Sequence, residues 1–309
     1  MIYTVTLNPA LDKEYRVSDL LENSILRATS VKLDYGGKGF NIARMLAGFG
    51  SDCVALAFIG GHTGDVLSEG LKRSGLRTDF VHVHGETRTN ISIVSESNNR
   101  YIKVNEPGPE VSNKETDELL QKIEALIQPG DWWILAGSLP VGMRADSYAR
   151  MIRLINEGGA KAILDTSGDA LRLGCLAEPF LIKPNLEELD QILDIEVKDS
   201  MGIGKAIKRM HELGVKNIVL SAGKGETICS DGAKQWVGTP PKIDEMNPVG
   251  AGDAMLAAIV YRLSKNESIL DAFSWGIAAG SAAASLPGTS MPNMDQIQRL
   301  LDKVIVNEE

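Results

Sequence analysis

Apolar runs alternate with amphipathic stretches along most of the chain. The apolar runs that end in a turn-forming or polar residue are typical of strands buried on both faces: residues 3–7, 53–60, 132–137, 160–165, 180–185 and 217–223. Between them lie stretches with helical spacing, most of them stopped by glycine: residues 40–50, 65–75, 116–127, 147–158 and 204–214. This alternation predicts βαβ units and a mainly parallel sheet covered by helices, which is an α/β fold.

Two stretches depart from this rhythm. Residues 12–35 and 81–105 contain short alternating segments such as EYRV, NISIVSE and RYIKVN. We expect them to form an antiparallel β flap, or lid, inserted in a single domain that spans residues 1–309. The stretch MDQIQRLLDKVI near the end of the chain predicts one closing helix.

Composition narrows the class of partner. The chain has 309 residues, of which 43% are hydrophobic, so it can bury a sizeable core. Its formal charge of −9 argues against nucleic acid as the main partner, but it leaves room for a phosphorylated small molecule in a local basic pocket. No run of apolar residues is long enough to span a membrane, and the start MIYTVTLNPA does not resemble a signal peptide. We therefore expect a cytoplasmic protein without a membrane partner.

A first glycine turn lies in DYGGKGFNIARML, residues 34–46. Glycine-rich turns ahead of helices leave backbone N–H groups bare and usually approach an anion. The P-loop pattern does not fit, because a glycine follows Lys38 and no glycine stands five residues before Gly37. A dinucleotide fingerprint is also missing from the sequence. The turn therefore does not by itself predict a nucleotide site.

A second glycine turn lies in NPVGAGDAMLAAIVYRL, residues 247–263, ahead of a strongly apolar helix. Amides at a helix start carry partial positive charge, and small residues let an anion come close. Asp253 stands at this helix start and allows two interpretations. It is either an N-cap for the first-turn amides or a base placed beside an anion hole.

The chain resembles the ribokinase-like (PfkB-type) carbohydrate kinases over nearly its whole length. TLNPALD, GGKGFNIA, KPNLEE and GAGD, in this order and spacing, carry the resemblance, and ETRTN, GSLP and NPVGAGD are most similar to the branch with 1-phosphofructokinase and tagatose-6-phosphate kinase. The resemblance implies a three-layer α/β/α sandwich. It also implies ATP-dependent phosphorylation of fructose 1-phosphate or tagatose 6-phosphate to the bisphosphate, with fructose 6-phosphate as the runner-up substrate.

The resemblance implies roles at the phosphate-transfer end. Asp253 would be the general base, and the amides of Gly250, Ala251 and Gly252 would stabilise the transferring phosphoryl group. Asn185 and Glu188 would position Mg²⁺ with the triphosphate through water. The residues expected to line the nucleotide site are Lys183, Asn185, Ser221, Gly223, Gly225, Gly250 and Gly252.

The resemblance also implies a substrate end. Asp12 and Asn41 would bind sugar hydroxyls, and the other residues expected there are Gly37, Lys38 and Ser138. The basic residues Arg27, Lys38, Arg88 and Lys103 suit a substrate that already carries a phosphate, because guanidinium and ammonium groups bind phosphate through charge-assisted hydrogen bonds.

Two further expectations come from the family. One is a homodimer formed through the lid. The other concerns K⁺, because the commoner form of the second motif is D-T-x-G-A-G-D, whereas this chain has Asn247 and Pro248 in place of Asp and Thr. A requirement for K⁺ therefore stays open.

Two rival functions come from other classes. A catalytically silent sugar-phosphate sensor would have no need for Asp253, GAG and KPNLEE together. A nicotinamide-dependent dehydrogenase would need the missing G-x-G-x-x-G and a ribose-binding acid.

Overall fold

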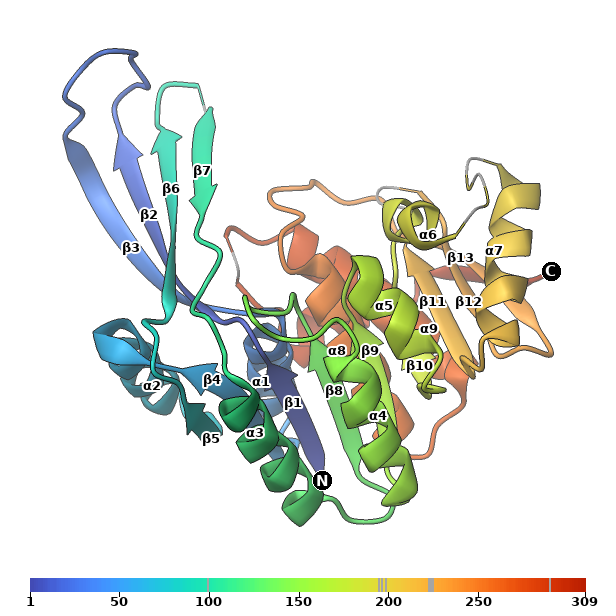
Figure 1. Ribbon diagram of the computed structural model, residues 1–309. Coiled ribbons are helices and arrows are strands. Elements are labelled where there is room, and N and C mark those ends of the chain that lie inside the picture. Colours follow the sequence, from blue (N-terminus) through green and yellow to red (C-terminus); the bar gives the residue numbers. More distant parts are fainter. Residues whose placement is uncertain (99, 194, 196, 198, 222–224, 289) are drawn as a thin grey trace.

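A large, mostly parallel sheet forms the body of the molecule (Figure 1). The computed structural model describes residues 1–309 except 99, 194, 196, 198, 222–224 and 289. Pairing is parallel from β5 across to β11 and antiparallel from β11 to β14. In spatial order the strands are β14 (Ile305–Glu308), β13 (Gln235–Thr239), β12 (Thr227–Ser230), β11 (Asn217–Ser221), β10 (Leu181–Ile182), β9 (Lys161–Asp165), β8 (Trp132–Ala136), β1 (Ile2–Thr6), β4 (Cys53–Ile59) and β5 (Arg77–His82).

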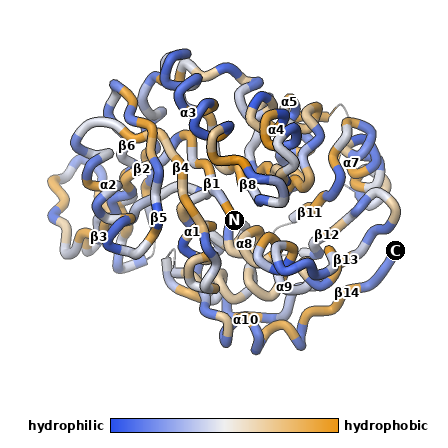
Figure 2. The backbone as a smooth tube through the Cα atoms, turned by 90° about the horizontal axis from the view of Figure 1, so that it is seen from below, coloured by the Kyte–Doolittle hydropathy of each residue, from blue (hydrophilic) through white to orange (hydrophobic). Residues whose placement is uncertain are grey.

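Helices cover both faces of this sheet, and Figure 2 shows the two layers on either side of the band of strands. One layer packs into a core with α8 and α9 at its centre and holds α1 (Lys38–Gly48), α2 (Gly61–Arg73), α8 (Ala251–Ser264), α9 (Ile269–Ala284) and α10 (Met294–Leu301). The other layer holds α3 (Asn113–Leu126), α4 (Ser147–Glu157), α5 (Gly168–Cys175), α6 (Leu186–Ile192) and α7 (Ser200–Glu212). The predicted three-layer α/β/α architecture is confirmed.

A separate four-stranded sheet stands away from the body (Figure 1), and we call it the lid. Its strands, in spatial order, are β3 (Ala28–Gly36), β2 (Ala10–Val17), β6 (Arg88–Ser95) and β7 (Tyr101–Asn105). The β2–β3 and β6–β7 pairs are antiparallel, as expected, and the two pairs join through parallel pairing of β2 with β6. The second lid segment begins at Arg88 and not near residue 81, because β5 pairs with β4 in the main sheet.

The predicted apolar runs all contain strands, and the predicted amphipathic stretches all contain helices. The predicted closing helix is present but shorter than expected, and a strand follows it. Helix α10 ends at Leu301, and β14 then pairs with β13 at the edge of the main sheet. Pairing with β13 satisfies backbone N–H and C=O groups of the last residues. Among the described residues, no helix is long and apolar enough to cross a membrane.

Candidate active site

The ends of several elements converge at one edge of the main sheet. Asp165 is the last residue of β9, and Lys183 directly follows β10. Lys38 opens α1, and Asp253 lies in the first turn of α8. Lys38 and Lys183 pair with Asp165, and Asn41 of α1 bonds to Asp253, so the structure brings together groups that are widely separated in the sequence.

Asp253 is not the N-cap of its helix, so the capping interpretation is wrong. The N-cap is Gly250, in the left-handed conformation with φ 85°, and glycine has no side chain that could cap. The Asp253 carboxylate is instead buried and accepts a 2.7 Å hydrogen bond from Nδ2 of Asn41. Burial and the negative charge of Asp165 raise the pKa of Asp253 to about 6, although Asn41 and two lysines act against this shift.

A buried carboxylate holds two lysines beside Asp253. Asp165 is completely buried, with Nζ of Lys38 at 2.9 Å from its Oδ1 and Nζ of Lys183 at 3.5 Å from its Oδ2. Burial acts to raise the pKa of Asp165, but the two ammonium groups outweigh it and hold that pKa below its ordinary value. Burial acts to lower the pKa of Lys38, but Asp165 raises it to about 12. Asp165 and Lys38 are therefore both charged at neutral pH.

The glycines of the first turn make room for protein atoms. A Cβ on Gly39 would lie 2.3 Å from Oγ1 of Thr6, and one on Gly36 would lie 2.0 Å from Oδ2 of Asp12. Gly37 has φ 143°, which only glycine adopts readily, and a Cβ there would lie 2.7 Å from Cγ2 of Thr6. These glycines press the turn against β1 and the lid, and this packing places Lys38 at the site.

The turn before α8 only partly matches the predicted anion hole. The amide of Ala251 already donates to the carbonyl oxygen of Pro248 at 3.2 Å. Gly252 lies in the first turn, where no helical carbonyl precedes its amide. A Cβ on Gly252 would lie 3.2 Å from Nζ of Lys183, so this ammonium group lies against the helix start. Gly250 and Gly252 therefore remain the better placed of the three predicted amide donors.

The two predicted magnesium residues form a capping box at the start of α6. Oδ1 of Asn185 accepts from the amide of Glu188 at 2.8 Å, and Oε2 of Glu188 accepts from the amide of Asn185 at 2.9 Å. The described residues contain no cluster of carboxylates, histidines and cysteines that could hold a metal by themselves. Oε1 of Glu188 has no hydrogen-bond partner among the described residues, which suits an ion bound mainly by phosphates and water.

The other predicted nucleotide residues lie around the end of β11. Ser221 ends β11, forms an isolated parallel bridge with Asn185, and donates from its amide to Pro184. Gly225 lies in an exposed bend after this strand. Gly223 lies outside the described residues.

The predicted sugar-binding residues gather where the lid joins the body. Oδ1 of Asp12 accepts a 2.7 Å hydrogen bond from Asn90 on the neighbouring strand, and burial raises the pKa of Asp12. Lys103 shares the lid face of Asp12, since it is one two-residue step along the paired strands. Ser138 follows β8 and is exposed.

The two predicted arginines lie in different surroundings. Arg88 is half-buried and donates to the carbonyl oxygens of Asn8, Pro9 and Glu106, so three of its five N–H groups are engaged. Arg27 is exposed and precedes β3, about 20 Å along the lid from the row that contains Asp12, at the rise of an extended strand. The structure therefore does not bring Arg27 to the other site residues within one chain.

Asp165 and Asn90 are the site residues that the sequence analysis missed. Asp165 carried a usable signal, because a carboxylate ends the apolar run 160–165. The carboxyl ends of parallel strands meet at one edge of the sheet, where ligands bind. Asn90 ends the ETRTN motif, but its place was not predictable, since only the parallel pairing of β2 with β6 sets it opposite Asp12.

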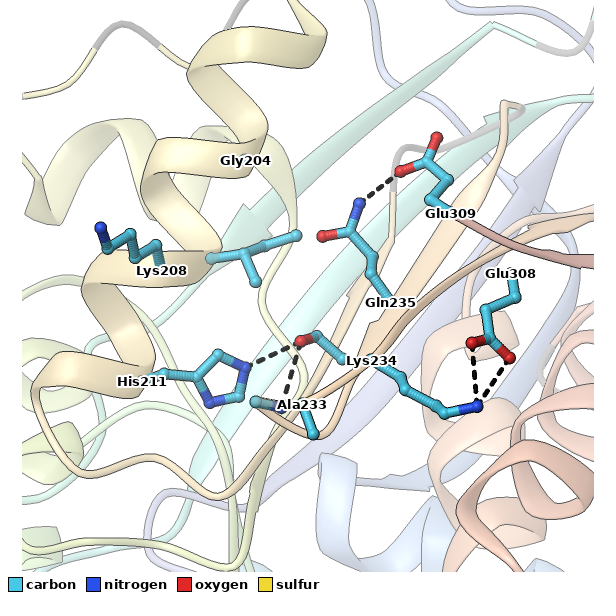
Figure 3. Close-up of a pocket in the computed structure, with 11 residues that line it drawn as sticks. Gly204, Lys208, His211, Ala233, Lys234, Gln235, Glu308 and Glu309 are labelled. Atoms are coloured by element: carbon cyan, nitrogen blue, oxygen red, sulfur yellow. Dashed lines mark hydrogen bonds and ion pairs between the residues drawn. The ribbon is translucent and has the colours of Figure 1, made fainter.

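A second hollow lies away from this site, between α7, the β12–β13 turn and β14 (Figure 3). There His211 lies between the carbonyl oxygen of Val215 (2.8 Å) and Oγ of Ser230 (2.9 Å), and Lys234 pairs with Glu308. Ser230 pairs with Ile218, near the start of β11, so this hollow is at the opposite end of that strand from Ser221. It is therefore not part of the candidate active site.

Comparison with known proteins adds to this geometry. Residues 6–296 match the model of the pfkB family of carbohydrate kinases. A 1-phosphofructokinase from Borreliella burgdorferi is 32% identical over 309 residues, which cover 100% of this chain and 99% of that protein. Phosphofructokinase-2 from Escherichia coli, covered to 98% in both chains, gives TM-scores of 0.93 for its potassium complex and 0.90 for its fructose-6-phosphate complex, at 29% and 28% identity.

A more distant structure is similar in fold alone. Ribokinase from Arabidopsis thaliana, solved with ribose and ATP, is 21% identical with a TM-score of 0.78, covering 97% of this chain and 98% of that chain.

Proposed function

Because this chain belongs to the pfkB family of carbohydrate kinases, we propose that it transfers the γ-phosphoryl group of ATP to a ketohexose monophosphate. Fructose 1-phosphate is the first candidate, since a 1-phosphofructokinase is similar over the full length of the chain. Tagatose 6-phosphate is the alternative from the same branch, and fructose 6-phosphate follows from the likeness to phosphofructokinase-2. The use of ATP fits the cytoplasmic location expected from the sequence.

The observation that carries this proposal is the buried Asp253 with a pKa raised to about 6. Such a carboxylate is ionised at neutral pH and is still basic enough to take a proton from the acceptor hydroxyl. The hydroxyl oxygen then attacks the γ-phosphorus while the bond from that phosphorus to the β–γ bridging oxygen breaks, and ADP leaves. The amide of Gly252 would stabilise the charge in transfer.

Lys38 acts at the transfer end in this proposal, not on the phosphate that the substrate already carries. Its ammonium group is bonded to Asp165 and feels the charge of Asp253, and Lys183 pairs with the same Asp165. A carboxylate that holds two ammonium groups offsets their mutual repulsion, so both can face one phosphoryl group. Phosphoryl transfer depends mainly on such positioning and charge neutralisation.

Magnesium, when bound with ATP, would neutralise charge on the phosphates, and Glu188 would contact it through water. Its carboxylate keeps one oxygen outside the capping box. Asn247 stands where the commoner motif has Asp, and its side-chain amide donates to the carbonyl oxygen of Gly288 at 2.9 Å. The proposal therefore assigns no role to K⁺. The potassium complex of phosphofructokinase-2 makes matched assays in KCl and NaCl worthwhile.

The phosphate that the substrate already carries would bind at the lid, to Lys103 and to the remaining N–H groups of Arg88. Arg27 is too far along the lid to share a ligand with Asp12 in the same chain, so its predicted phosphate contact requires a second copy. We propose that two lids pair. The face opposite Asp12 exposes Val31, Leu33, Ile102 and Val104, which are 46–56% exposed in the single chain.

The proposal is tested by ADP release with Mg-ATP against fructose 1-phosphate, tagatose 6-phosphate, fructose 6-phosphate, fructose and ribose. We expect kcat/KM for one phosphosugar to exceed that for the free sugars at least about tenfold. One charge-assisted hydrogen bond to the phosphate is enough for a difference of this size. Lys103→Ala should raise KM for that phosphosugar about tenfold and leave KM for ATP unchanged. Lys114→Ala is the matched control, since Lys114 is exposed on α3 of the body.

Other outcomes would reject parts of the proposal. Equal activity on free sugars would show that the basic residues do not select a phosphate. Binding of a phosphosugar without any ADP release would favour the sensor.

A further inference from the structure

Arg44, in α1, lies between the lid and Asp253. Its guanidinium donates to Oδ1 of Asp34 at 3.0 Å and to the carbonyl oxygen of Tyr35 at 3.1 Å, both in lid strand β3. It also donates to Oδ1 of Asn41 at 2.6 Å. Asn41 in turn donates from Nδ2 to Oδ2 of Asp253 at 2.7 Å. A continuous chain of hydrogen bonds therefore joins the lid to Asp253.

Arg44 determines which way the Asn41 amide points. A guanidinium has five donors and no acceptor, so the atom of Asn41 that faces it must be the oxygen. The amide nitrogen then faces Asp253 and must donate to it. Without a donor at Arg44, the same amide could turn over and present its oxygen to Asp253, where only a protonated carboxyl could donate in return.

The surroundings make these contacts stronger than those of a surface pair. The side chains of Arg44 and Asp34 are 21% and 20% exposed, and Asp253 is 6% exposed. Charge-assisted hydrogen bonds that are shielded from water are worth more than exposed ones. Strand β3 also continues through Gly37 directly into α1, so a movement of β3 acts on Arg44 both through the backbone and through Asp34.

We propose that Arg44 is a positioning residue, which holds the Asn41 amide in the orientation that donates to Asp253 and ties that orientation to lid strand β3. The consequence for catalysis rests on the proposed function. When β3 is in place, Asp253 receives its hydrogen bond and is kept ionised and aligned. When β3 moves away, Asn41 loses the contact that fixes it. The lid would thus prepare the base as well as cover the substrate.

The titration of Asp253 reports on this orientation. The charged groups that face Asp253 are Lys38 on α1, Asp165 at the end of β9, and Lys183 after β10. A change at Arg44 leaves all three in place. A hydrogen bond donated by Asn41 favours the ionised carboxylate, so losing it raises the pKa of Asp253.

The test is an NMR titration of the full chain with ¹³Cγ-labelled aspartate, in which Asp253 is assigned by the signal missing from Asp253→Asn. We expect Arg44→Gln to raise the pKa of Asp253 by about one pH unit and Arg44→Lys to raise it less. In an Asn41→Ala background, Arg44→Gln should have no further effect. Arg172→Gln, which removes an exposed pair with Asp169, is the matched control and should leave the titration unchanged.

Kinetics give a second readout. Arg44→Gln should shift the acid limb of kcat to higher pH and lower kcat at neutral pH, with KM for ATP unchanged. An unchanged Asp253 titration in Arg44→Gln, or the same shift with and without Asn41, would overturn the inference. The titration needs no turnover, so a wild-type chain without kinase activity would reject the proposed function while Arg44 is still decided. If Arg44→Gln does not fold, as judged by its melting curve, Arg44→Met decides, because methionine has a similar length and no N–H donor, and an unchanged Asp253 titration in it would overturn the inference.

Discussion

At the scale of single residues, the site depends on two buried carboxylates and on the lysines beside one of them. Asp253 is raised in pKa by burial and by Asp165, whereas Asp165 is kept ionised by Lys38 and Lys183. Two neighbouring carboxylates therefore differ in pKa, because the two lysines pair directly with Asp165.

Asp253→Asn should separate activity from stability. We expect kcat to fall by about 10²–10⁴, since the proton acceptor is lost. The folded-state pKa of about 6 exceeds the ordinary value of 3.8, so the wild type loses stability as the pH rises between these values. The variant lacks this cost and should be more stable by about 2–3 kcal/mol at about pH 8. Urea denaturation of both proteins at about pH 8 and about pH 4 checks this. The same difference in unfolding free energy between variant and wild type at the two pH values would contradict it.

Asp165→Asn should act in the opposite sense. It leaves Lys38 and Lys183 without their carboxylate, so we expect a loss of about 2–4 kcal/mol in unfolding free energy. It also removes a negative charge near Asp253, so the acid limb of kcat should move to lower pH. Asp169→Asn, at an exposed pair with Arg172, is the control. Unchanged stability and an unchanged acid limb would show that Asp165 does not couple these groups.

At the scale of elements, α1 reaches the site only because its first turn has almost no side chains. Oγ1 of Thr6 occupies the space that a Cβ on Gly39 would need, and the Asp12 carboxylate occupies the space that a Cβ on Gly36 would need. The helix therefore starts in contact with β1, and Lys38, Asn41 and Arg44 project from it toward Asp165, Asp253 and the lid.

Gly39→Ala should disturb this contact. The new Cβ would lie 2.3 Å from Oγ1 of Thr6, so α1 must shift, and we expect a loss of about 1–3 kcal/mol in stability together with lower kcat/KM. Adding Thr6→Ala should restore part of both. Gly48→Ala, near the end of the same helix with nothing within 4 Å of its Cβ, should be neutral or slightly stabilising. Equal melting temperatures for the two alanine variants would refute the steric explanation.

At the scale of the whole molecule, the lid has two unlike faces. One face carries Asp12 and Lys103 toward the predicted substrate, and the other exposes apolar side chains on β3 and β7. An exposed apolar sheet face of this kind is a candidate for association with a second copy.

Val31→Ser combined with Ile102→Ser should weaken this association. Analytical ultracentrifugation should show a dimer for the wild type and at least a tenfold higher dissociation constant for the double variant, about 1.4 kcal/mol. Val141→Ser combined with Leu176→Ser, at exposed positions of the body, is the matched control. A monomeric wild type would remove the lid as an interface and, with it, the predicted role of Arg27.

The sequence by itself determined the α/β class, because local hydrophobic periodicity encodes each buried strand and amphipathic helix. It failed for α9, which is buried along nearly its whole length and so has no polar face to give a helical period. It placed the end of the closing helix at Ile305, whereas α10 ends at Leu301 and β14 begins at Ile305. The glycine motifs located Lys38, Asn41 and Asp253, since close backbone approach requires glycine at fixed positions.

Only the tertiary structure decided how these residues act on one another. Asp165 is matched to Lys38 and Lys183 because β9 and β10 are neighbours in the sheet. Arg44 reaches both Asp34 and Asn41 because β3 lies against α1. Such pairings depend on distances between atoms of separate elements, and spacing along the chain does not contain them.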